Sequence, residues 1–334
     1  MKRICMMLAA VCLLCGCTDG RTAHSETAES SFDPFYMPPL NMSDRIDANF
    51  GFGLTDPPEN DRFAYSDEMT LRFYADNAAQ EADFGLMLFV NGVLQEYRFE
   101  EEPAKSTLFR FPVGKDEKRE FTVSFSPKAA ESDSECVLSY SLMFHPDFTP
   151  QSAQCSFGNY YRLMSLSASL TDVPDGCKTV KTLRAAETAP IPEELRAKYY
   201  ELDADGNVVS DLLRTSTQLR TEKLSADYPD AADDPAPNAL HRGDSVRLTL
   251  LGGAKERTWR ISMYCDHALV TAFDSAQYLD MTASNETMSV YTVPVSVIGK
   301  REPEFGSVYF VAAPLGADAA DDPYRSHVFV YAGE

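Results

Sequence analysis

Hydrophobic residues alternate with polar ones along much of the chain, which is the spacing of a β-strand with one buried face. In residues 67–75, Met69, Leu71 and Phe73 alternate with Thr70 and Arg72. Because successive side chains of a strand point to opposite faces, this spacing predicts a half-buried strand. Similar strand patterns occur in the segments 106–113, 119–127, 136–144 and 160–170.

A tight turn is predicted between two apolar runs in residues 84–99. Asn91 and Gly92 separate these runs, and both residue types tolerate the positive φ angles that a two-residue hairpin turn requires. With this hairpin, the region holds seven short strands within about 110 residues, which fits an antiparallel sandwich of the immunoglobulin type.

A second β-rich region begins near Pro190. One helical turn is expected within residues 191–198, followed by a hairpin over 199–209 that turns at Asp205 and Gly206. Trp259 shares a strand face with Ile261 and Met263, so the single tryptophan is predicted to lie in the core on a central strand. Further strands are predicted over residues 245–251, 258–264, 288–298, 307–315 and 327–332.

These patterns predict an all-β protein with two immunoglobulin-like antiparallel β-sandwich domains. The first domain is expected to span residues 46–180 and the second residues 185–334, with an acidic, proline-bearing insertion at 225–240. Residues 17–45 are expected to form a flexible or extended tether, because residues 18–31 are small and polar and have no apolar periodicity.

The chain begins with the pattern of a secretory signal. Two basic residues precede an apolar stretch over residues 4–14 that is too short to span a bilayer. The sequence Leu14-Cys15-Gly16-Cys17 resembles the cleavage box of bacterial lipoproteins, with Cys15 where that class usually has Ala or Ser. The resemblance implies that residues 1–16 are a removed signal peptide and that Cys17 is lipidated. The mature protein would then be extracytoplasmic and anchored by lipid to a membrane of the bacterial cell envelope.

The balance of charges argues against nucleic acid as a partner. The chain has 30 Lys and Arg residues against 51 Asp and Glu residues, which gives a formal net charge of −21. A polyanion would be repelled at long range by such a surface. The remaining partners are a membrane, through the lipid on Cys17, and a glycan or a surface protein.

Four cysteines lie outside the signal and lipid box. Cys136, Cys155, Cys177 and Cys265 allow three pairings, and a bridge is favoured among the first three because they share one predicted domain. None of the four stands in a Cys/His spacing typical of structural zinc. No cofactor is therefore predicted.

Two acidic patterns are candidates for binding a divalent cation. Asp203 and Asp205 alternate in the predicted turn, but the glycine comes two places too early for an EF-hand, and a plain hairpin turn accounts for them better. The sequence DAADDP occurs twice, and a cation would relieve the repulsion among its carboxylates, although solvated loops account for both copies better. The candidate ligands in these copies are Asp230, Asp233, Asp318 and Asp321.

Two tyrosine pairs are candidates for binding a carbohydrate ligand. Adjacent residues of a one-sided strand cannot both be buried, so each pair is expected to present one ring to solvent. Exposed aromatic faces are what sugar rings stack on, although single surface tyrosines are common in proteins that bind no sugar. The residues are Tyr160, Tyr161, Tyr199 and Tyr200.

The sequence contains none of the motifs that mark common catalytic sites. It lacks a Gly-x-Ser-x-Gly elbow, a glycine-rich phosphate loop and a His-Glu-x-x-His motif. We therefore predict a non-catalytic binding or interaction module for a glycan, a cell-wall component or a surface protein. Two alternatives stay open. One is a polysaccharide hydrolase whose two carboxylates are brought together only by folding. The other is a structural component of a surface assembly.

Overall fold

The computed structural model describes residues 49–185, 188–225, 227–228, 233–299, 305–316 and 322–332. Within these ranges the protein is all-β, and it consists of two immunoglobulin-like sandwiches and one short α-helix, α1 (Glu193–Arg196). This confirms the predicted fold class. Both sandwiches belong to one compact unit, Pro39–Glu334. The division into domains at residues 180–185 stays a prediction.

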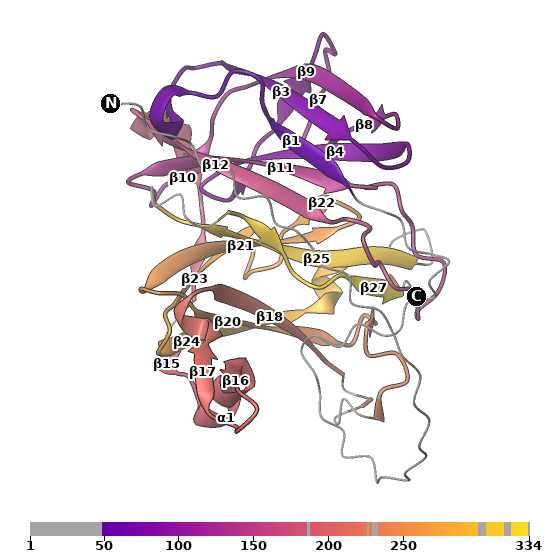
Figure 1. Cartoon of the computed structure of the whole chain (residues 1–334), viewed down its shortest axis with the longest axis vertical. Coiled ribbons are helices and arrows are strands. Elements are labelled where there is room, and N and C mark those ends of the chain that lie inside the picture. Colours follow the sequence, from indigo (N-terminus) through magenta and orange to yellow (C-terminus); the bar gives the residue numbers. More distant parts are fainter. Residues whose placement is uncertain are drawn as a thin grey trace. The chain divides into compact units, whose positions relative to one another are not determined.

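Two sheets form the first sandwich, and their long strands are antiparallel (Figure 1). The first sheet contains, in order, β1 (Phe50–Leu54), β3 (Met69–Asn77), β9 (Glu117–Phe125), β6 (Tyr97–Phe99) and β7 (Lys105–Ser106). The second sheet contains β2 (Arg62–Ala64), β12 (Leu163–Thr171), β11 (Cys136–Phe144), β4 (Ala82–Val90) and β5 (Val93–Leu94), and β8 (Phe109–Val113) also pairs with β4. A short parallel pair joins β10 (Ala129–Ala130) to β13 (Lys178–Val180).

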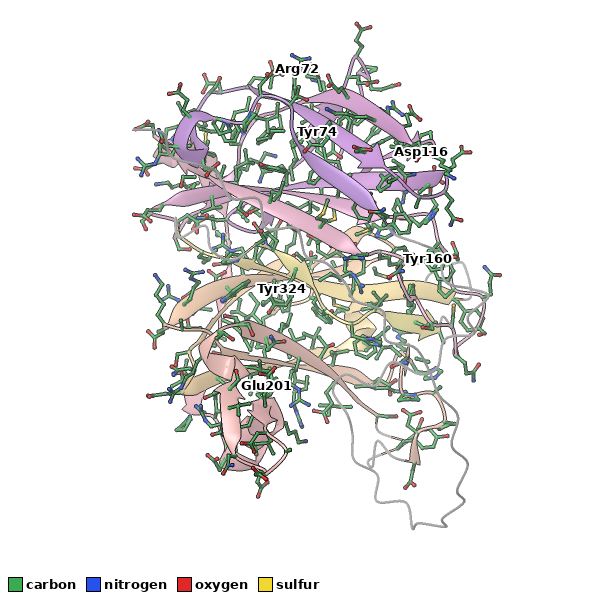
Figure 2. All side chains as sticks on the ribbon, in the orientation of Figure 1. Arg72, Tyr74, Asp116, Tyr160, Glu201 and Tyr324 are labelled. Atoms are coloured by element: carbon green, nitrogen blue, oxygen red, sulfur yellow. The ribbon has the colours of Figure 1, made fainter. Side chains whose placement is uncertain are left out.

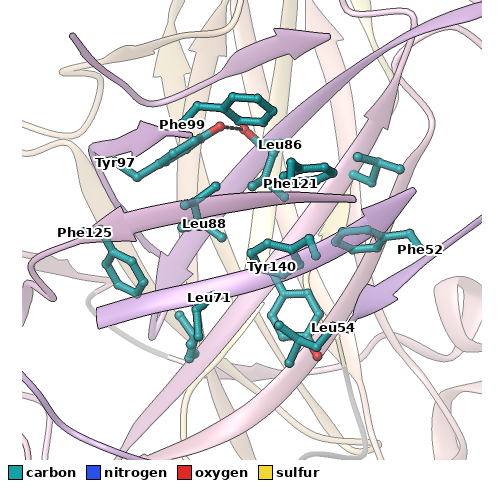
Figure 3. Packing of buried hydrophobic residues seen from close by; sticks show 14 of the residues in the cluster. Phe52, Leu54, Leu71, Leu86, Leu88, Tyr97, Phe99, Phe121, Phe125 and Tyr140 are labelled. Carbon is teal, nitrogen blue, oxygen red and sulfur yellow. Dashed lines mark hydrogen bonds between the residues drawn. The ribbon is translucent and has the colours of Figure 1, made fainter. Parts of the chain in front are cut away.

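The core of the first sandwich is rich in aromatic rings (Figure 3). Phe73 and Phe121 stack across neighbouring strands with 5.7 Å between ring centroids. The hydroxyl of Tyr97 is buried there and donates a 2.5 Å hydrogen bond to the carbonyl oxygen of Leu86. Burial raises the pKa of Tyr97. The alternating residues that predicted the strands thus supply the core, as the period of two requires.

Two further sheets form the second sandwich. The third sheet contains β14 (Leu183–Arg184), β23 (Tyr278–Ala283), β21 (Arg257–Cys265), β25 (Phe305–Pro314), β27 (Phe329–Ala332) and β19 (Ala239–Leu240). To it are added β22 (Ala268–Val270), which pairs with β21, and β26 (Tyr324–Arg325), which pairs with β25. The fourth sheet contains β15 (Thr188–Pro190), β24 (Thr287–Pro294), β20 (Ser245–Gly252) and β18 (Thr217–Leu224). Trp259 lies buried on β21, between β23 and β25, as predicted.

The second and third sheets pack against each other, so that their central strands β4, β11, β21 and β25 are buried on both faces. On β21, Ile261 and Met263 point into the core of the second sandwich, whereas Tyr264 joins a cluster with residues of the first. On β4, Leu88 belongs to the core of the first sandwich and Phe89 to the shared cluster. This layer explains why residues 84–90 read as a nearly continuous apolar run: both faces of the strand are buried.

A buried arginine crosses this contact between the sandwiches. Arg260 on β21 is fully buried; its Nε lies 2.8 Å from Oδ1 of Asp280, and its Nη1 lies 3.0 Å from Oδ2 of Asp133. Nη1 also donates to the carbonyl oxygen of Asn91, at 2.8 Å. Asp133 and Asn91 belong to the first sandwich and Asp280 to the second. Asp280 therefore pairs with the guanidinium within the second sandwich, whereas the buried carboxylate of Asp133 gains its cation only when the two sandwiches are in contact.

The predicted turn at Asn91 and Gly92 is confirmed, and it lies at this contact. The two residues have φ angles of 45° and 71° and connect β4 to β5. The Asn91 side chain accepts from the amide of Val137 and donates to the carbonyl of Glu135. A Cβ at Gly92 would lie 2.8 Å from Cβ of Ala313 on β25. Gly92 is thus required by both its backbone conformation and the close approach of the third sheet.

His267 lies at another point of the same contact. Its Nε2 donates to the carbonyl oxygen of Pro146 at 2.6 Å, and its Nδ1 lies 2.9 Å from the hydroxyl of Tyr309. Burial lowers the pKa of His267 from 6.5 to about 4, against the opposing effect of the Pro146 carbonyl. The ring is therefore neutral at pH 7. Because Nε2 carries the ring proton, Nδ1 accepts a hydrogen bond from the hydroxyl of Tyr309.

We expect this histidine to make stability fall in mild acid. The unfolded ring takes up a proton near pH 6.5, and the folded ring only near pH 4. The contribution of the neutral ring to the free energy of unfolding is therefore complete above pH 6.5, and it is lost as the pH falls from 6.5 to 4. Between pH 7 and pH 5 the loss is about 2 kcal/mol in the free energy of unfolding. Urea titrations of the protein and of His267→Gln measure it. The difference in the free energy of unfolding between the wild type and His267→Gln should be smaller at pH 5 than at pH 7 by that amount. The stability of His241→Gln, at an exposed histidine, should follow that of the wild type at both pH values. A pH-independent difference for His267→Gln would contradict the assignment.

Several sequence-based expectations need correction. Tyr160 and Tyr161 lie in a turn that precedes β12, not on the strand. The predicted strand at 288–298 ends at Pro294 and continues as a 3-10 helix. β18 and β23 were not predicted, because β18 has few apolar residues and β23 is almost entirely buried. The four described cysteines form no disulfide, so the favoured bridge is absent.

Candidate interaction site

A separate two-stranded hairpin stands next to the fourth sheet. It consists of β16 (Tyr200–Leu202) and β17 (Val208–Asp211), and Figure 1 shows it beside α1. The turn is organised by Asp203, whose Oδ1 accepts from the backbone amides of Asp205 and Asn207 at 2.9 and 2.8 Å. Hydrogen bonds from Asn207 lower the pKa of Asp203. Gly206, with a φ of 82°, completes the turn.

The base of the hairpin is fixed to the body of the second sandwich. Arg196 on α1 donates from Nη1 to Oδ2 of Asp211 at 2.8 Å and from Nη2 to the carbonyl of Asn285. The other oxygen of Asp211 accepts from the amide of Leu213, the second residue of the 3-10 helix Leu212–Arg214. Tyr199 and Leu213 are buried in one small apolar cluster. These contacts hold the hairpin in place while its tip extends into solvent.

The tip exposes apolar side chains with nothing described to cover them. The side chains of Leu202, Val208 and Val209 are 58%, 52% and 63% exposed, the highest values among the large hydrophobic residues of the described ranges. Leu202 and Val208 are cross-strand partners, and Val209 is the unpaired extra residue of a β-bulge between Val208 and Ser210. The three exposed apolar residues thus lie at one end of the hairpin. We call these three residues the hairpin patch.

Acidic residues surround the hairpin patch. Glu201, labelled in Figure 2, Asp203 and Asp205 are all exposed and lie within three residues of Leu202. A few exposed apolar residues are normal on a protein surface, but a cluster with a polar rim on a fixed element is typical of a contact site. The sequence predicted this hairpin and its turn. It did not predict the exposed patch, because the sequence pattern does not show whether a third strand covers the hairpin.

The four tyrosines that are candidates for binding a carbohydrate lie in different environments. Tyr160 (Figure 2) is half-buried and stacks on Phe148 with 3.8 Å between ring centroids. Tyr161 is buried, and its hydroxyl donates to the carbonyl of Phe148. Tyr199 is buried, and Tyr200 is half-exposed with its hydroxyl 3.5 Å from Oε1 of Glu193. Ligand binding by these residues stays a prediction.

The structure describes only some of the candidate cation ligands. Asp203 is engaged by the turn, as the plain hairpin interpretation predicts, and Asp205 is exposed. Asp233 is exposed within the acidic insertion. In the described part of the chain no group of three or more acidic, His or Cys side chains is arranged to hold a metal ion. Cys17, Asp230, Asp318 and Asp321 lie outside the described residues.

In the described part of the chain, folding brings together two pairs of buried acidic side chains, but each pair shares one cation. Asp133 and Asp280 bind Arg260, and all three are buried. Asp234 and Asp244 bind Lys223, with Nζ to Oδ2 distances of 2.8 and 3.6 Å. Burial acts to raise the pKa of Asp234, but hydrogen bonds from Lys223 and from the amide of Ala236 outweigh it and lower that pKa. The side chains of these carboxylates are buried and held by a cation, so they contribute to the fold and are closed to a substrate.

No family model and no curated protein matches the chain. Solved structures that resemble it include a protein of unknown function from Porphyromonas gingivalis W83, at 11% identity and a TM-score of 0.21, with 85% of this chain and 99% of that chain covered. Another is the E. coli chaperone DraB, at 12% identity and a TM-score of 0.22, with 86% and 97% covered. A third is the Salmonella enterica SafA pilin in complex with the SafB chaperone, at 11% identity and a TM-score of 0.23, with 86% and 98% covered. At these values the likeness does not bear on function. Across the described residues, no helix is long and apolar enough to cross a membrane.

Proposed function

We propose that the protein is a non-catalytic interaction module of the bacterial cell envelope, tethered by a lipid on Cys17, which binds a surface protein through the hairpin patch. The exposure of Leu202, Val208 and Val209 at the tip of a fixed hairpin carries this proposal. Because the three apolar side chains lie on a narrow two-stranded hairpin, they fit a groove better than a flat surface.

The charges around the patch indicate the chemistry of the partner. The rim is acidic, and the whole chain has a formal net charge of −21. A groove with apolar walls and basic residues at its edges would complement both features. An acidic partner or a bare anionic lipid surface would be repelled.

A cross-linking experiment in cells tests the binding function. A photoreactive amino acid at Val209 should give one dominant adduct with a surface protein. The same amino acid at Val290, a 44% exposed residue of β24, should not. Equal adducts from both positions, or no adduct from Val209, would contradict the proposal.

In the same cells, Cys17→Ser should move the protein from the membrane fraction to the soluble extracytoplasmic fraction. Continued membrane residence would contradict the lipid anchor.

Charged residues at the hairpin patch should then weaken binding without unfolding the protein. The double variant Val208→Asp/Val209→Asp removes apolar contact area worth about 1.5–3 kcal/mol for each side chain. We expect at least a tenfold loss of affinity for the purified cross-linked partner in isothermal titration calorimetry. The melting temperature should stay within about 2 °C of the wild type, because both side chains are exposed. Val290→Asp is the matched control, and it should bind as the wild type does.

A further inference from the structure

The longest strand at a sheet edge is β18. It has eight residues and pairs with β20 without interruption, from Thr217 opposite Gly252 to Leu224 opposite Ser245. The other terminal strands of the four sheets have five residues or fewer: β1, β7, β2, β5, β14, β19 and β15. In the described ranges no strand pairs with the outer side of β18. Its outward N–H and C=O groups therefore form a template on which another strand can be added.

Two of the three charged residues of β18, Arg220 and Glu222, lie symmetrically about Thr221, on the face of the strand opposite to the core residue Leu219. The third, Lys223, lies on the same face as Leu219 and is paired with Asp234 and Asp244. Glu222 forms an exposed ion pair with Arg247 on β20, at 3.2 Å. Arg220 lies beside the hydroxyl of Tyr199 and hydrogen-bonds to it. Glu222 is exposed, and Arg220 is half-buried.

This arrangement selects one register for two identical strands. In an antiparallel pair with a twofold axis at Thr221, each Arg220 lies opposite Glu222 of the other copy. A twofold axis at Arg220 would place the two copies of Arg220 opposite each other, and an axis at Glu222 would do the same with Glu222. Both registers are disfavoured, because like charges in directly opposite positions are destabilising. Registers shifted by one residue would put the core face of one copy on the solvent side of the other.

We propose that two copies of the chain pair through β18 in antiparallel fashion, with Thr221 on the twofold axis. The two fourth sheets then form one continuous sheet. An isologous contact of this kind closes on itself, so it yields a dimer and not a filament. This surface is distinct from the hairpin patch, and the proposal does not depend on the patch binding a partner.

The dimer is expected to be weak and sensitive to salt. A strand-to-strand contact is smaller than a standard interface, so we expect a dissociation constant on the order of 10 µM. The two copies are both acidic, with a formal charge of −21 each. Measurements therefore belong at about 150 mM salt, where the screening length of about 8 Å suppresses long-range repulsion but leaves directly opposed pairs in force.

Charge reversal on the full chain tests the proposal by sedimentation velocity. Arg220→Glu places acids opposite acids, and Glu222→Arg places bases opposite bases, so each variant should be monomeric up to about ten times the wild-type dissociation constant. The double variant Arg220→Glu/Glu222→Arg should form dimers again. An equimolar mixture of the two single variants should form heterodimers, because every opposed pair is then complementary.

Two controls separate pairing from a loss of folding. Arg72→Glu reverses an exposed arginine of β3 in the first sandwich, and it should leave the dimer unchanged. The melting temperature of each variant shows whether the second sandwich is intact, and the heterodimer test works only with folded variants. A wild-type chain that stays monomeric at 500 µM (about fifty times the expected constant) overturns the proposal. A mixture that forms no heterodimer while the wild type dimerises overturns it equally.

Discussion

Replacement of Arg260 by methionine is expected to lower the free energy of unfolding by about 3–5 kcal/mol, because it leaves buried carboxylates without their shared cation. Arg260 is 0% exposed, and both Asp133 and Asp280 are buried. Burial acts to lower the pKa of the guanidinium, but hydrogen bonds to Asp280 and Asp133 outweigh it and raise that pKa above its ordinary value. The charged form is thus stabilised by the network.

Chemical denaturation measures this effect, and Arg98 supplies the matched control. Arg98 also pairs with an acid, Glu68, but both side chains are about half-exposed. Arg98→Met should therefore change stability by less than about 1 kcal/mol. In the Arg260→Met background, Asp133→Asn should recover part of the loss, since it removes one uncompensated charge. Equal effects of Arg260→Met and Arg98→Met would show that Arg260 is not enclosed between the sandwiches.

Substitution of Gly92 by alanine is expected to cost more than the same change at Gly206, although both glycines have positive φ. Gly206 has a φ of 82° and open space around it, so alanine there should cost only backbone strain of about 1–2 kcal/mol. At Gly92 the new Cβ would also meet Cβ of Ala313 at 2.8 Å and Cβ of Arg260 at 3.0 Å. Overpacking of this kind adds about 1–3 kcal/mol.

Urea titrations of the two alanine variants give this difference directly. Gly92→Ala should have a midpoint clearly below that of Gly206→Ala, with the slope of the transition preserved if unfolding stays two-state. Because backbone strain is common to both variants, the difference reports the close approach of the third sheet to the turn. Equal midpoints would mean that Gly92 is not packed against β25.

The strands of the first sandwich were predictable because their signal is local. Period-two alternation places β3, β9 and β11 within a few residues of their observed bounds, and the Asn91-Gly92 pair identifies its turn. Turn residues need particular φ angles and strand residues need one buried face, and both requirements are satisfied by neighbours in the sequence.

The contact between the sandwiches was not predictable, because no local pattern encodes it. Arg260 lies between the apolar residues Trp259 and Ile261, so the sequence indicates only that it is on the opposite face, which in an isolated sandwich would be solvated. Its partner Asp133 is 127 positions away. Similarly, Val208 and Val209 read as part of an ordinary hairpin, and only the sheet topology shows that their hairpin is a separate two-stranded sheet.

The central claim is that the second and third sheets pack directly against each other, and one NMR measurement tests it most directly. With the methyl group of Ala313 and the α protons of Gly92 assigned in a selectively labelled sample, the account predicts a strong nuclear Overhauser cross-peak between them, since a Cβ at Gly92 would lie 2.8 Å from that of Ala313. The absence of this cross-peak, with both resonances sharp and assigned, would contradict the packing of β4 and β5 against β25.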